Sequence, residues 1–514
     1  MTAKKFIPDN RQITINPKYA LISVFDKTGI VDFAKSLIKL GFEIISTGGT
    51  AKTLIEAGIK IIPIEKVTKN PESFDGRMKT ISFQIEGGIL FDRSNKTHQK
   101  QAKDLGIIPI DMVVCNFYPF EQKNSIENID IGGPTMVRAA AKNYKHVTVI
   151  VDPNDYIKVI KSLEDNKLNT LKKALAAKAF RLLTYYDSLV SRYLTEDVFP
   201  EKITIPGKKI MDLRYGENPH QKAAFYADPQ IRSSLQFLKK HWGRDLSLVN
   251  ITDINAGIES VRLFREPCSV VIKHNTPCGI SLGNTISQAL ERAIDADTES
   301  AFGGIIVVNK PIDLACAKVV GPHIDIIAAP KIEKNAFEYL KSLRKSMGIY
   351  TFGNIPPVTS KYQIKWLEGG FVIQDADSDI DKSFKNWKVV TKEKPTKKQL
   401  EQMKIGWKFA SRIKSNTVIV VDKNTPMTRG IGSGQTSRVK STKIALADCG
   451  KYAKGAILVS DSFFPFDDSV KLAAEHGISA IVQQGGSIND QKVIDTADKL
   501  GVAMMFTGRR AFWH

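Results

Sequence analysis

The sequence has few of the features that mark secreted, zinc-dependent or membrane-spanning proteins. Its 514 residues include only five cysteines and eight histidines, and no two cysteines form a CxxC pair. Scattered cysteines of odd number favour a reducing compartment and argue against disulfides or a structural zinc site. No apolar run approaches the roughly 20 residues of a membrane span, and the opening residues lack the apolar segment of a signal peptide. We therefore expect a cytoplasmic protein without a membrane partner or a required metal.

The charge is strongly basic, but no basic arm stands out. Lys and Arg number 74 against 54 Asp and Glu, a formal net charge of +20. Such an excess is compatible with nucleic-acid binding, with sites for anionic small molecules, or with a lysine-rich background. The lysines are spread along the chain, and no RNA- or DNA-binding motif with interleaved aromatic residues is present. We predict no nucleic-acid partner. The length favours two to four soluble domains.

The first 200 residues alternate between strand and helix patterns. Residues 19–25 and 42–45 are typical of strands, and residues 30–38 and 51–57 of helices. This βαβα order predicts an open parallel sheet with ligands at the carboxyl ends of its strands. Two loops at that edge, residues 23–28 and 46–50, carry hydroxyls, glycines and Lys27, which suit a phosphate monoester. A plain tight turn is the alternative for the Gly48-Gly49 loop alone.

A second region begins after a cluster of proline, glycine and charge, and we set the boundary near residue 200. There the apolar run 269–272 predicts a buried strand that ends at Lys273-His274, and residues 276–279 predict a turn. A histidine titrates near neutral pH and a confined lysine loses its proton easily, so the pair suits proton transfer. A surface basic pair at a strand end is the alternative.

Further along, residues 358–403 are typical of a connection between subdomains, and a third α/β pattern follows. The strand pattern 417–421 precedes the glycine-rich run 430–438, whose GxGxGQ spacing differs from the dinucleotide motif GxGxxG. We therefore predict no nicotinamide cofactor. The strand pattern 456–459 leads into a loop with three phenylalanines and Asp468. These aromatic side chains suit a flat heteroaromatic ring, or belong to the core.

Several polar motifs complete the first 200 residues: 76–80, 115–120, 129–135 and 138–143. Taken singly, their charged residues are typical of surface or capping positions. In wording and order, however, these segments resemble the N-terminal half of the bifunctional purine-biosynthesis family that combines AICAR transformylase with IMP cyclohydrolase. That half is similar in fold to methylglyoxal synthase and closes the purine ring. The resemblance implies a cyclohydrolase set of Lys79, Tyr118, Asp130 and Lys142. It also implies a phosphate and nucleotide cradle of Ser23, Lys27, Ser46, Thr47, Gly48, Gly49, Thr50 and Arg77.

One segment departs from the family pattern. The family usually continues Lys-Thr-Leu-His-Pro-Lys-Ile/Val-His-Gly-Gly after the matching glycine and arginine, whereas Ser82 and Glu86 stand at the two histidine positions here. The matched lysine, tyrosine, aspartate and second lysine remain. We keep the prediction of cyclohydrolase activity. If the two substitutions have an effect, we expect it in the rate or the pH profile of that activity.

The rest of the chain resembles the same family to its last residue. The resemblance implies a cyclohydrolase domain at 1–200 and a transformylase domain at 201–514. The latter comprises two cytidine-deaminase-like units without zinc, at about 201–360 and 390–514, and the absence of PCxxC and HxE motifs agrees with this. The implied catalytic residues are Lys273 and His274, with Asn416 at the formyl group and His514 on the nucleotide side. The implied nucleotide contacts are Arg214, Tyr215, Ser300, Phe302, Gly303, Asp325 and Arg510, and the implied folate contacts are Gln435, Phe463 and Asp468.

The resemblance implies two reactions and one formyl donor. 10-Formyl-tetrahydrofolate would formylate AICAR to FAICAR, which would then cyclise to IMP, with no metal required. It also implies a homodimer with transformylase sites at the interface. Two alternatives stay open: a transformylase with an impaired cyclohydrolase half, and a non-catalytic purine-nucleotide-binding protein. Only the loss of the two histidines favours either.

Overall fold

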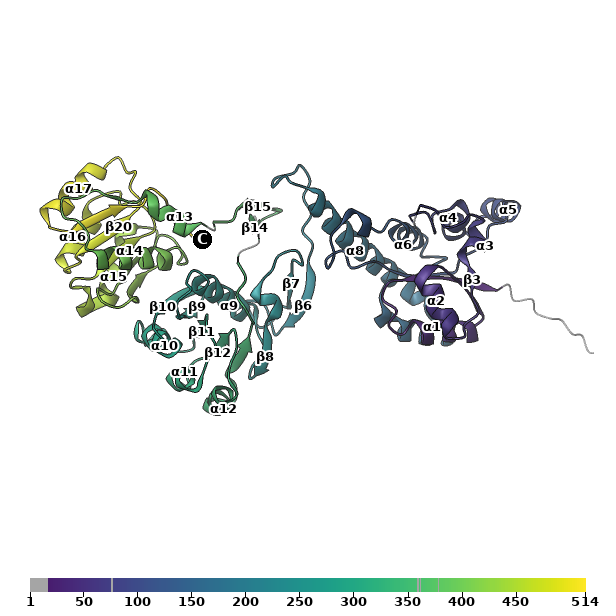
Figure 1. Cartoon of the computed structure of the whole chain (residues 1–514), viewed down its shortest axis with the longest axis horizontal. Coiled ribbons are helices and arrows are strands. Elements are labelled where there is room, and N and C mark those ends of the chain that lie inside the picture. The colour runs from purple at the N-terminus through teal and green to yellow at the C-terminus, as the bar shows by residue number, and fades with distance from the viewer. Residues whose placement is uncertain (1–16, 75–76, 358–359, 361, 378) are drawn as a thin grey trace, which may run out of the picture. The chain divides into compact units, whose positions relative to one another are not determined.

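The computed structural model in Figure 1 describes residues 17–74, 77–357, 360, 362–377 and 379–514. The chain divides into two compact units, Met1–Gly207 and Lys208–His514. Each unit has its own sheets and its own core. Among the described residues, no helix is both long enough and apolar enough to span a bilayer.

The first unit is built on one sheet of parallel strands. Its strands are β1 (Lys18–Val24), β2 (Phe42–Ser46), β3 (Ile62–Pro63), β4 (Met112–Asn116) and β5 (Thr148–Ile150). They lie in the order β3-β2-β1-β4-β5, and every pairing is parallel. The predicted open parallel sheet is confirmed. Because the strands are all parallel, the loops after β1, β2 and β4 open at one edge.

Helices cover both faces of this sheet. They are α1 (Ile30–Lys39), α2 (Gly48–Glu56), α3 (Ile64–Thr68), α4 (Phe83–Leu90), α5 (Lys96–Asp104), α6 (Gly132–Lys142), α7 (Tyr156–Glu164) and α8 (Leu168–Leu194). Side chains of α1, α2 and α7 pack on one face, in the core that contains Ile22 and Ile44. Side chains of α4, α6 and most of α8 pack on the other face, in the core that contains Leu21 and Ile45. Adjacent strand residues therefore point into different cores, as the alternation of a doubly covered sheet requires.

The second unit contains two six-stranded sheets with the same plan. The first sheet runs β10-β9-β11-β12-β13-β8 and the second β18-β17-β19-β20-β21-β16. In each sheet the central three-strand run is parallel and the other three strands are antiparallel to their neighbours. The strands of the first are β8 (Lys239–Trp242), β9 (Cys268–Lys273), β10 (Thr276–Leu282), β11 (Ile305–Val308), β12 (Ile326–Ala329) and β13 (Gly348–Thr351). Those of the second are β16 (Lys388–Val389), β17 (Val418–Val421), β18 (Thr428–Gly432), β19 (Ile457–Ser460), β20 (Ala480–Gln483) and β21 (Ala503–Phe506).

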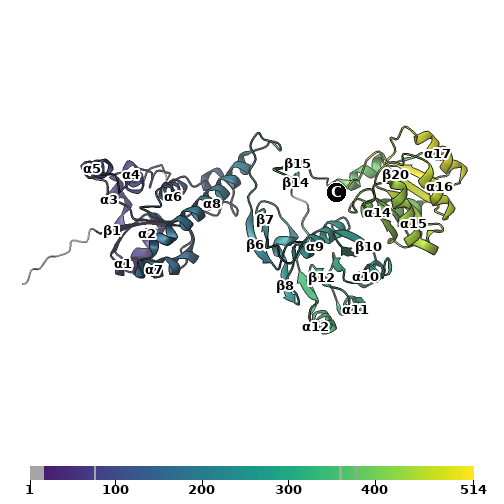
Figure 2. The same ribbon diagram turned by 180° about the vertical axis from the view of Figure 1, so that it is seen from behind.

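Two helices lie between these sheets, and the remaining long helices cover their outer faces. α9 (Leu248–Val261) and α14 (Lys397–Ala410) share one core with the inner faces of both sheets. α10 (Ile286–Asp295), α11 (Leu314–Val319) and α12 (Lys334–Leu343) pack on the outer face of the first sheet, opposite α9 (Figure 2). α15 (Arg438–Cys449), α16 (Asp468–Glu475) and α17 (Asp490–Lys499) cover the second. The two predicted α/β patterns thus correspond to two similar sandwiches.

The two sheets meet at their edge strands. Ser281 of β10 forms an antiparallel bridge with Met427, next to β18, and Leu282 N–H donates to Pro426 C=O over 2.9 Å. The unit also has two hairpins, β6 (Lys208–Leu213) with β7 (Ala223–Ala227), and β14 (Tyr362–Leu367) with β15 (Gly370–Asp375). The segment interpreted as a connection between subdomains therefore holds a hairpin, the short helix α13 (Ile380–Ser383) and the start of α14.

Candidate functional sites

In the first unit, hydroxyl groups hold the loops at the carboxyl edge of the sheet. Ser46 Oγ donates to Ile22 C=O over 2.8 Å, and Thr50 Oγ1 donates to Val24 C=O over 2.9 Å. The Thr50 hydroxyl also accepts from Val24 N–H at 2.9 Å. Ser46 and Thr50 lie in the predicted cradle, but both hydroxyls are engaged by the backbone of β1. Ser23, the last but one residue of β1, is half-buried at the same edge.

The Gly48-Gly49 pair is not a loop, as the sequence predicted, but the first turn of α2. The exposed backbone of Gly48 lies in the left-handed region (φ 53°), and a methyl group built there would lie 2.8 Å from Lys79 Nζ. Lys27 Nζ lies 3.9 Å from the corresponding position of Gly49. Thr47 Oγ1 is buried without a hydrogen-bond partner among the described residues. A helix N-terminus, two ammonium groups and an unsatisfied hydroxyl together suit an anion.

The predicted proton-transfer residues of this unit have distinct surroundings. Lys79 Nζ lies 3.0 Å from the Glu72 carboxylate. Asp130 Oδ1 accepts from Gly133 N–H at 2.9 Å, at the start of α6. Burial raises the pKa of Asp130 above its usual range, and the Gly133 N–H opposes that rise. Tyr118 is 54% exposed with its ring 5.0 Å from that of Phe25, so its hydroxyl is accessible beside the loop after β1.

Two predicted basic residues of this unit, Arg77 and Lys142, are exposed. Arg77 is exposed and forms an ion pair with Glu127 over 2.5 Å. Lys142 is exposed at the last residue of α6, whereas Asp130 precedes the first. At 1.5 Å per residue, the helix separates the two positions by about 15 Å along its axis. The structure therefore does not bring Lys142 to Asp130.

The two residues that depart from the family pattern have separate surroundings. Ser82 caps α4, since its side chain accepts from Ile85 N–H at 3.1 Å. Glu86 lies one turn later with Oε1 buried and without a partner among the described residues. Burial raises the pKa of Glu86 to about 7. A carboxyl in this position therefore titrates near neutral pH.

In the second unit, Lys273 and His274 stand at the end of β9, as predicted, but the turn is not at residues 276–279. His274 and Asn275 form it, in the left-handed region with φ 55° and 61°, and Thr276 already begins β10. Lys273 Nζ donates to Phe302 C=O over 3.0 Å. The His274 side chain is exposed.

A buried carboxylate, which the sequence did not identify, holds this turn. Asp253 of α9 is 4% exposed and accepts from Asn275 N–H at 2.6 Å. Burial raises the pKa of Asp253, whereas the Asn275 N–H, the charge and N–H of His274 and the charge of Lys414 lower it. Lys414 is two residues before Asn416. Asp253 thus links the Lys273-His274 turn electrostatically to the segment that carries Asn416.

Four of the predicted nucleotide contacts lie at the same edge of the first sheet as Lys273 and His274. Ser300, Phe302 and Gly303 precede β11, and Asp325 precedes β12. Gly303 has φ 74° with open space where a side chain would be, and Phe302 is exposed with its ring 4.8 Å from that of His323. This open backbone suits the close approach of a ligand.

Two arginines that the sequence did not identify engage Asp325. Arg244 Nη1 lies 2.9 Å from Asp325 Oδ2, and Arg344 Nη2 lies 2.7 Å from Oδ1. A cavity of about 370 Å³ beside this trio is lined by Gly243, Arg244, Arg344, Lys345 and Ser346. Arg214, at the end of β6, stacks on Tyr215 with its guanidinium 4.7 Å from the ring. The backbone N–H of Arg214 donates to Leu246 C=O over 2.7 Å, and Leu246 lies just before α9.

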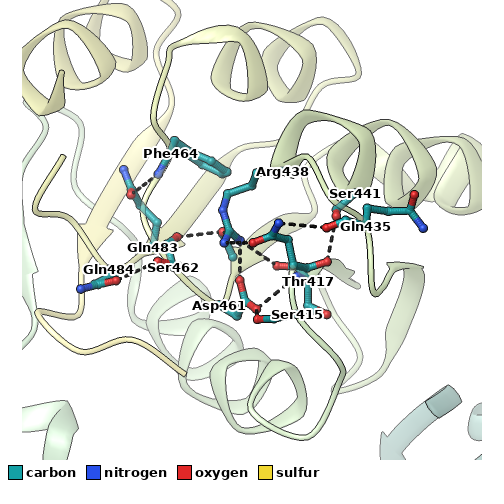
Figure 3. Close-up of polar contacts among 12 residues, drawn as sticks. Ser415, Thr417, Gln435, Arg438, Ser441, Asp461, Ser462, Phe464, Gln483 and Gln484 are labelled. Atoms are coloured by element: carbon teal, nitrogen blue, oxygen red, sulfur yellow. Dashed lines mark hydrogen bonds and ion pairs between the residues drawn. The ribbon is translucent and has the colours of Figure 1, made fainter. Parts of the chain in front are cut away.

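The predicted folate residues lie at an edge of the second sheet, where Figure 3 labels Gln435. Asn416 precedes β17, Gln435 follows β18, Phe463 follows β19, and Asp468 begins α16. Of the three phenylalanines in that loop, Phe464 is core, Phe466 is exposed and Phe463 is half-buried. The half-buried ring is the one that the resemblance assigned to folate.

The C-terminal tail docks beside Asn416. Ala511 N–H donates to Asp461 C=O over 2.8 Å, and Ser415 N–H donates to Trp513 C=O over 2.9 Å. Arg510 lies over the ring of Phe512 at 4.4 Å, and the rings of Phe512 and His514 are 5.5 Å apart. The side chains of Arg510 and His514 are exposed. Among the described residues, no three His, Cys, Asp or Glu side chains gather in a way that could hold a metal ion.

Comparisons with known proteins show the family to which the chain belongs. The family AICARFT/IMPCHase bienzyme matches residues 140–448, and the MGS-like domain family matches residues 29–135. A protein of Bacillus cereus (strain 03BB102), called bifunctional purine biosynthesis protein PurH, is 45% identical over 97% of this chain and its own full length. Proteins of the same name from Bacillus thuringiensis (strain Al Hakam) and Bacillus anthracis match equally, at 45% identity over 97% of this chain and 100% of their own. A solved structure entitled "Crystal structure of ForH" is 34% identical, covers 35% of this chain and all of its own, and has a TM-score of 0.33. The chain, with an MGS-like domain at its N-terminal end, belongs to the AICARFT/IMPCHase bienzyme family.

Proposed function

We propose that this protein carries out the last two steps of de novo purine biosynthesis. The second unit transfers the formyl group of 10-formyl-tetrahydrofolate to the amine of AICAR, and the first unit cyclises the product, FAICAR, to IMP with loss of water. The observation that carries the proposal is the His274-Asn275 turn on Asp253, which holds a proton-transfer pair at an open sheet edge in a chain of this family. We further propose a cytoplasmic homodimer with transformylase sites at its interface.

The formyl transfer needs a base and an electrophile. The AICAR amine is a poor nucleophile because its lone pair is delocalised into the ring, so His274 takes its proton as nitrogen attacks the formyl carbon. Lys273 donates to the oxyanion of the tetrahedral intermediate or to the departing folate nitrogen, and Asn416 orients the formyl oxygen. The C–N bond to folate then breaks. Ser300, Phe302, Gly303, Asp325, Arg214, Tyr215, Arg510 and His514 bind the nucleotide, and Gln435, Phe463 and Asp468 bind the folate.

The ring closure needs proton transfers at two atoms. The carboxamide nitrogen of FAICAR attacks the formyl carbon, and the oxygen leaves as water. Asp130, whose pKa burial raises, and Lys79 move these protons, while Tyr118 contacts the carboxamide. The α2 N-terminus with Lys27 and Thr47 binds the phosphate, in a cradle completed by Ser23, Ser46, Gly48, Gly49, Thr50 and Arg77. The role of Lys142 in positioning the carboxamide stays a prediction.

The test follows the two reactions separately in one mixture of protein, AICAR and 10-formyl-tetrahydrofolate. We expect both folate release and IMP. His274→Ala should abolish folate release yet leave cyclisation of added FAICAR intact, and Lys79→Met should do the reverse. Folate release without IMP would support the impaired-cyclohydrolase alternative, which Ser82 and Glu86 favour. Neither product, with nucleotide still bound, would support a binding protein.

A further inference from the structure

The amide of Asn416 is oriented by a buried arginine. Arg438, the first residue of α15, is 8% exposed and donates from Nη2 to Asn416 Oδ1 over 2.8 Å. Asn416 Nδ2 in turn donates to Gln435 C=O over 2.9 Å. A guanidinium has donors only, so the Asn416 atom that faces it must be the oxygen. Among the described contacts, this leaves one amide hydrogen of Asn416 for a ligand.

Asp461 fixes the arginine itself. Asp461 is fully buried, and its carboxylate accepts from Arg438 Nη1, from Ser415 Oγ and from Thr417 N–H, the last at 3.1 Å. Arg438 Nη1 also donates to Ser460 Oγ over 2.9 Å. Figure 3 shows Arg438 reaching from α15 between the start of β17 and the end of β19. The guanidinium therefore has little freedom to rotate.

Stability alone does not account for this pair. Removing two charges from water is costly, and well-packed apolar side chains of similar volume often replace a buried ion pair with no loss of stability. Here the pair has a second consequence, since Arg438 determines which atom of the Asn416 amide is presented. An amide turned by 180° would offer an acceptor where the formyl oxygen needs a donor.

We propose that Arg438, held by Asp461, is a positioning residue that presents the Asn416 amide hydrogen to the formyl oxygen during transfer. This rests on the proposed function, in which Asn416 orients that oxygen. Arg438 acts through Asn416 and does not itself contact the reacting atoms. Its removal should therefore lower the rate of transfer much more than nucleotide affinity.

The test is a double-mutant cycle on transformylase kcat with Asn416→Ala, Arg438→Met and both together. Loss of a preorganised donor costs about 10²-fold or more in kcat, so each single variant should lose about 10²-fold or more, with the KM for AICAR changed less than about threefold. If Arg438 acts through Asn416, Arg438→Met in the Asn416→Ala background should cost less than about threefold more.

A matched control and a second variant keep the test decisive. Arg429 is another arginine paired with aspartates, Asp422 and Asp295, but it is half-buried and lies at the opposite edge of the same sheet. Arg429→Met should leave transformylase kcat unchanged. If Arg438→Met melts below assay temperature, Arg438→Lys repeats the cycle, because lysine keeps the charge but cannot bond both partners. Circular dichroism and thermal unfolding of the full chain report whether the second unit of each variant is folded. If the effects of the two substitutions on kcat multiply in the double variant, Arg438 does not act through Asn416, and the proposal is overturned while Asn416 keeps its role. Full activity of Asn416→Ala would instead show that Asn416 does not orient the formyl oxygen. That result would remove this role from the proposed function and the positioning role of Arg438 with it.

Discussion

Glu86→Gln tests whether a half-buried carboxyl on α4 makes the first unit sensitive to pH. The side chain of Glu86 is half-buried on α4, with Oε1 unsatisfied among the described residues. Burial raises its pKa from the usual 4.5 to about 7. Glutamine has nearly the same shape and no charge, so the substitution removes the titration and little else.

The direction of the pH dependence follows from whether the folded or the unfolded chain loses the Glu86 proton at the lower pH. Between pH 4.5 and 7 the unfolded chain loses the Glu86 proton while the folded chain keeps it, so the free energy of unfolding falls as pH rises, and the loss is complete above pH 7. A pKa raised from 4.5 to about 7 corresponds to at most about 3.4 kcal/mol. Because the carboxyl is still partly exposed, solvent screening reduces this to about 1–2 kcal/mol.

The assay compares the full-length parent and Glu86→Gln by denaturant unfolding at pH 5 and pH 8, with amide exchange in α4 and α6 as a local measure. The parent should lose about 1–2 kcal/mol more than the variant over this range. Glu65→Gln, which removes an exposed carboxyl from α3, controls for the loss of one surface charge. If parent and Glu86→Gln lose stability in parallel, burial of Glu86 does not govern its titration and the reasoning fails.

Four further substitutions, at three positions, test the sites and the packing. Asp253→Ala removes the acceptor that holds the turn carrying His274 and should lower transformylase kcat about 10²-fold. Asp253→Asn keeps an acceptor for Asn275 N–H and should lower kcat less. Steady-state kinetics of the two variants measure the difference. Gly48→Ala sets a methyl group 2.8 Å from Lys79 Nζ at a positive φ and should raise the KM for FAICAR while leaving formyl transfer unchanged. Gly432→Ala would bring a methyl group to 1.9 Å from Ser441 C=O, and thermal unfolding should show a loss of about 1–3 kcal/mol.

Local sequence patterns predicted the scaffold better than the ends of its elements. The alternation in residues 19–57 predicted β1, α1 and β2 closely because each element buries a continuous apolar face. The start of α2 was predicted too late because glycine is a poor helix former. Gly48 and Gly49 nevertheless form the first turn of α2, where a side chain on either residue would contact Lys79 or Lys27. The turn after β9 was set too far along because proline and glycine usually mark turns. Tertiary contact with Asp253 instead stabilises it at His274 and Asn275.

The positioning residues were harder to predict than the reactive ones. Lys273 and His274 are conspicuous because they follow an apolar strand directly. Asp253 has no such context, since it lies on a helix, and its partner is 22 residues further along the chain. Arg244 and Asp325 are 81 residues apart. A buried charge that pairs across such a separation has no local pattern, so only the fold reveals it.

The two halves of the proposed transformylase site use opposite edges of two equivalent sheets, and strand directions explain how they still face one side. Lys273 and His274 follow the end of β9, whereas Asn416 precedes the start of β17, its equivalent in the second sheet. β9, β10, β18 and β17 are joined by three successive antiparallel contacts. The end of β9 and the start of β17 therefore lie on the same side of this run. The rule that ligands bind at carboxyl ends is the basis of the site proposed for the parallel sheet of the first unit. In the second unit, the antiparallel junction of two similar sheets brings the proposed catalytic residues to one side.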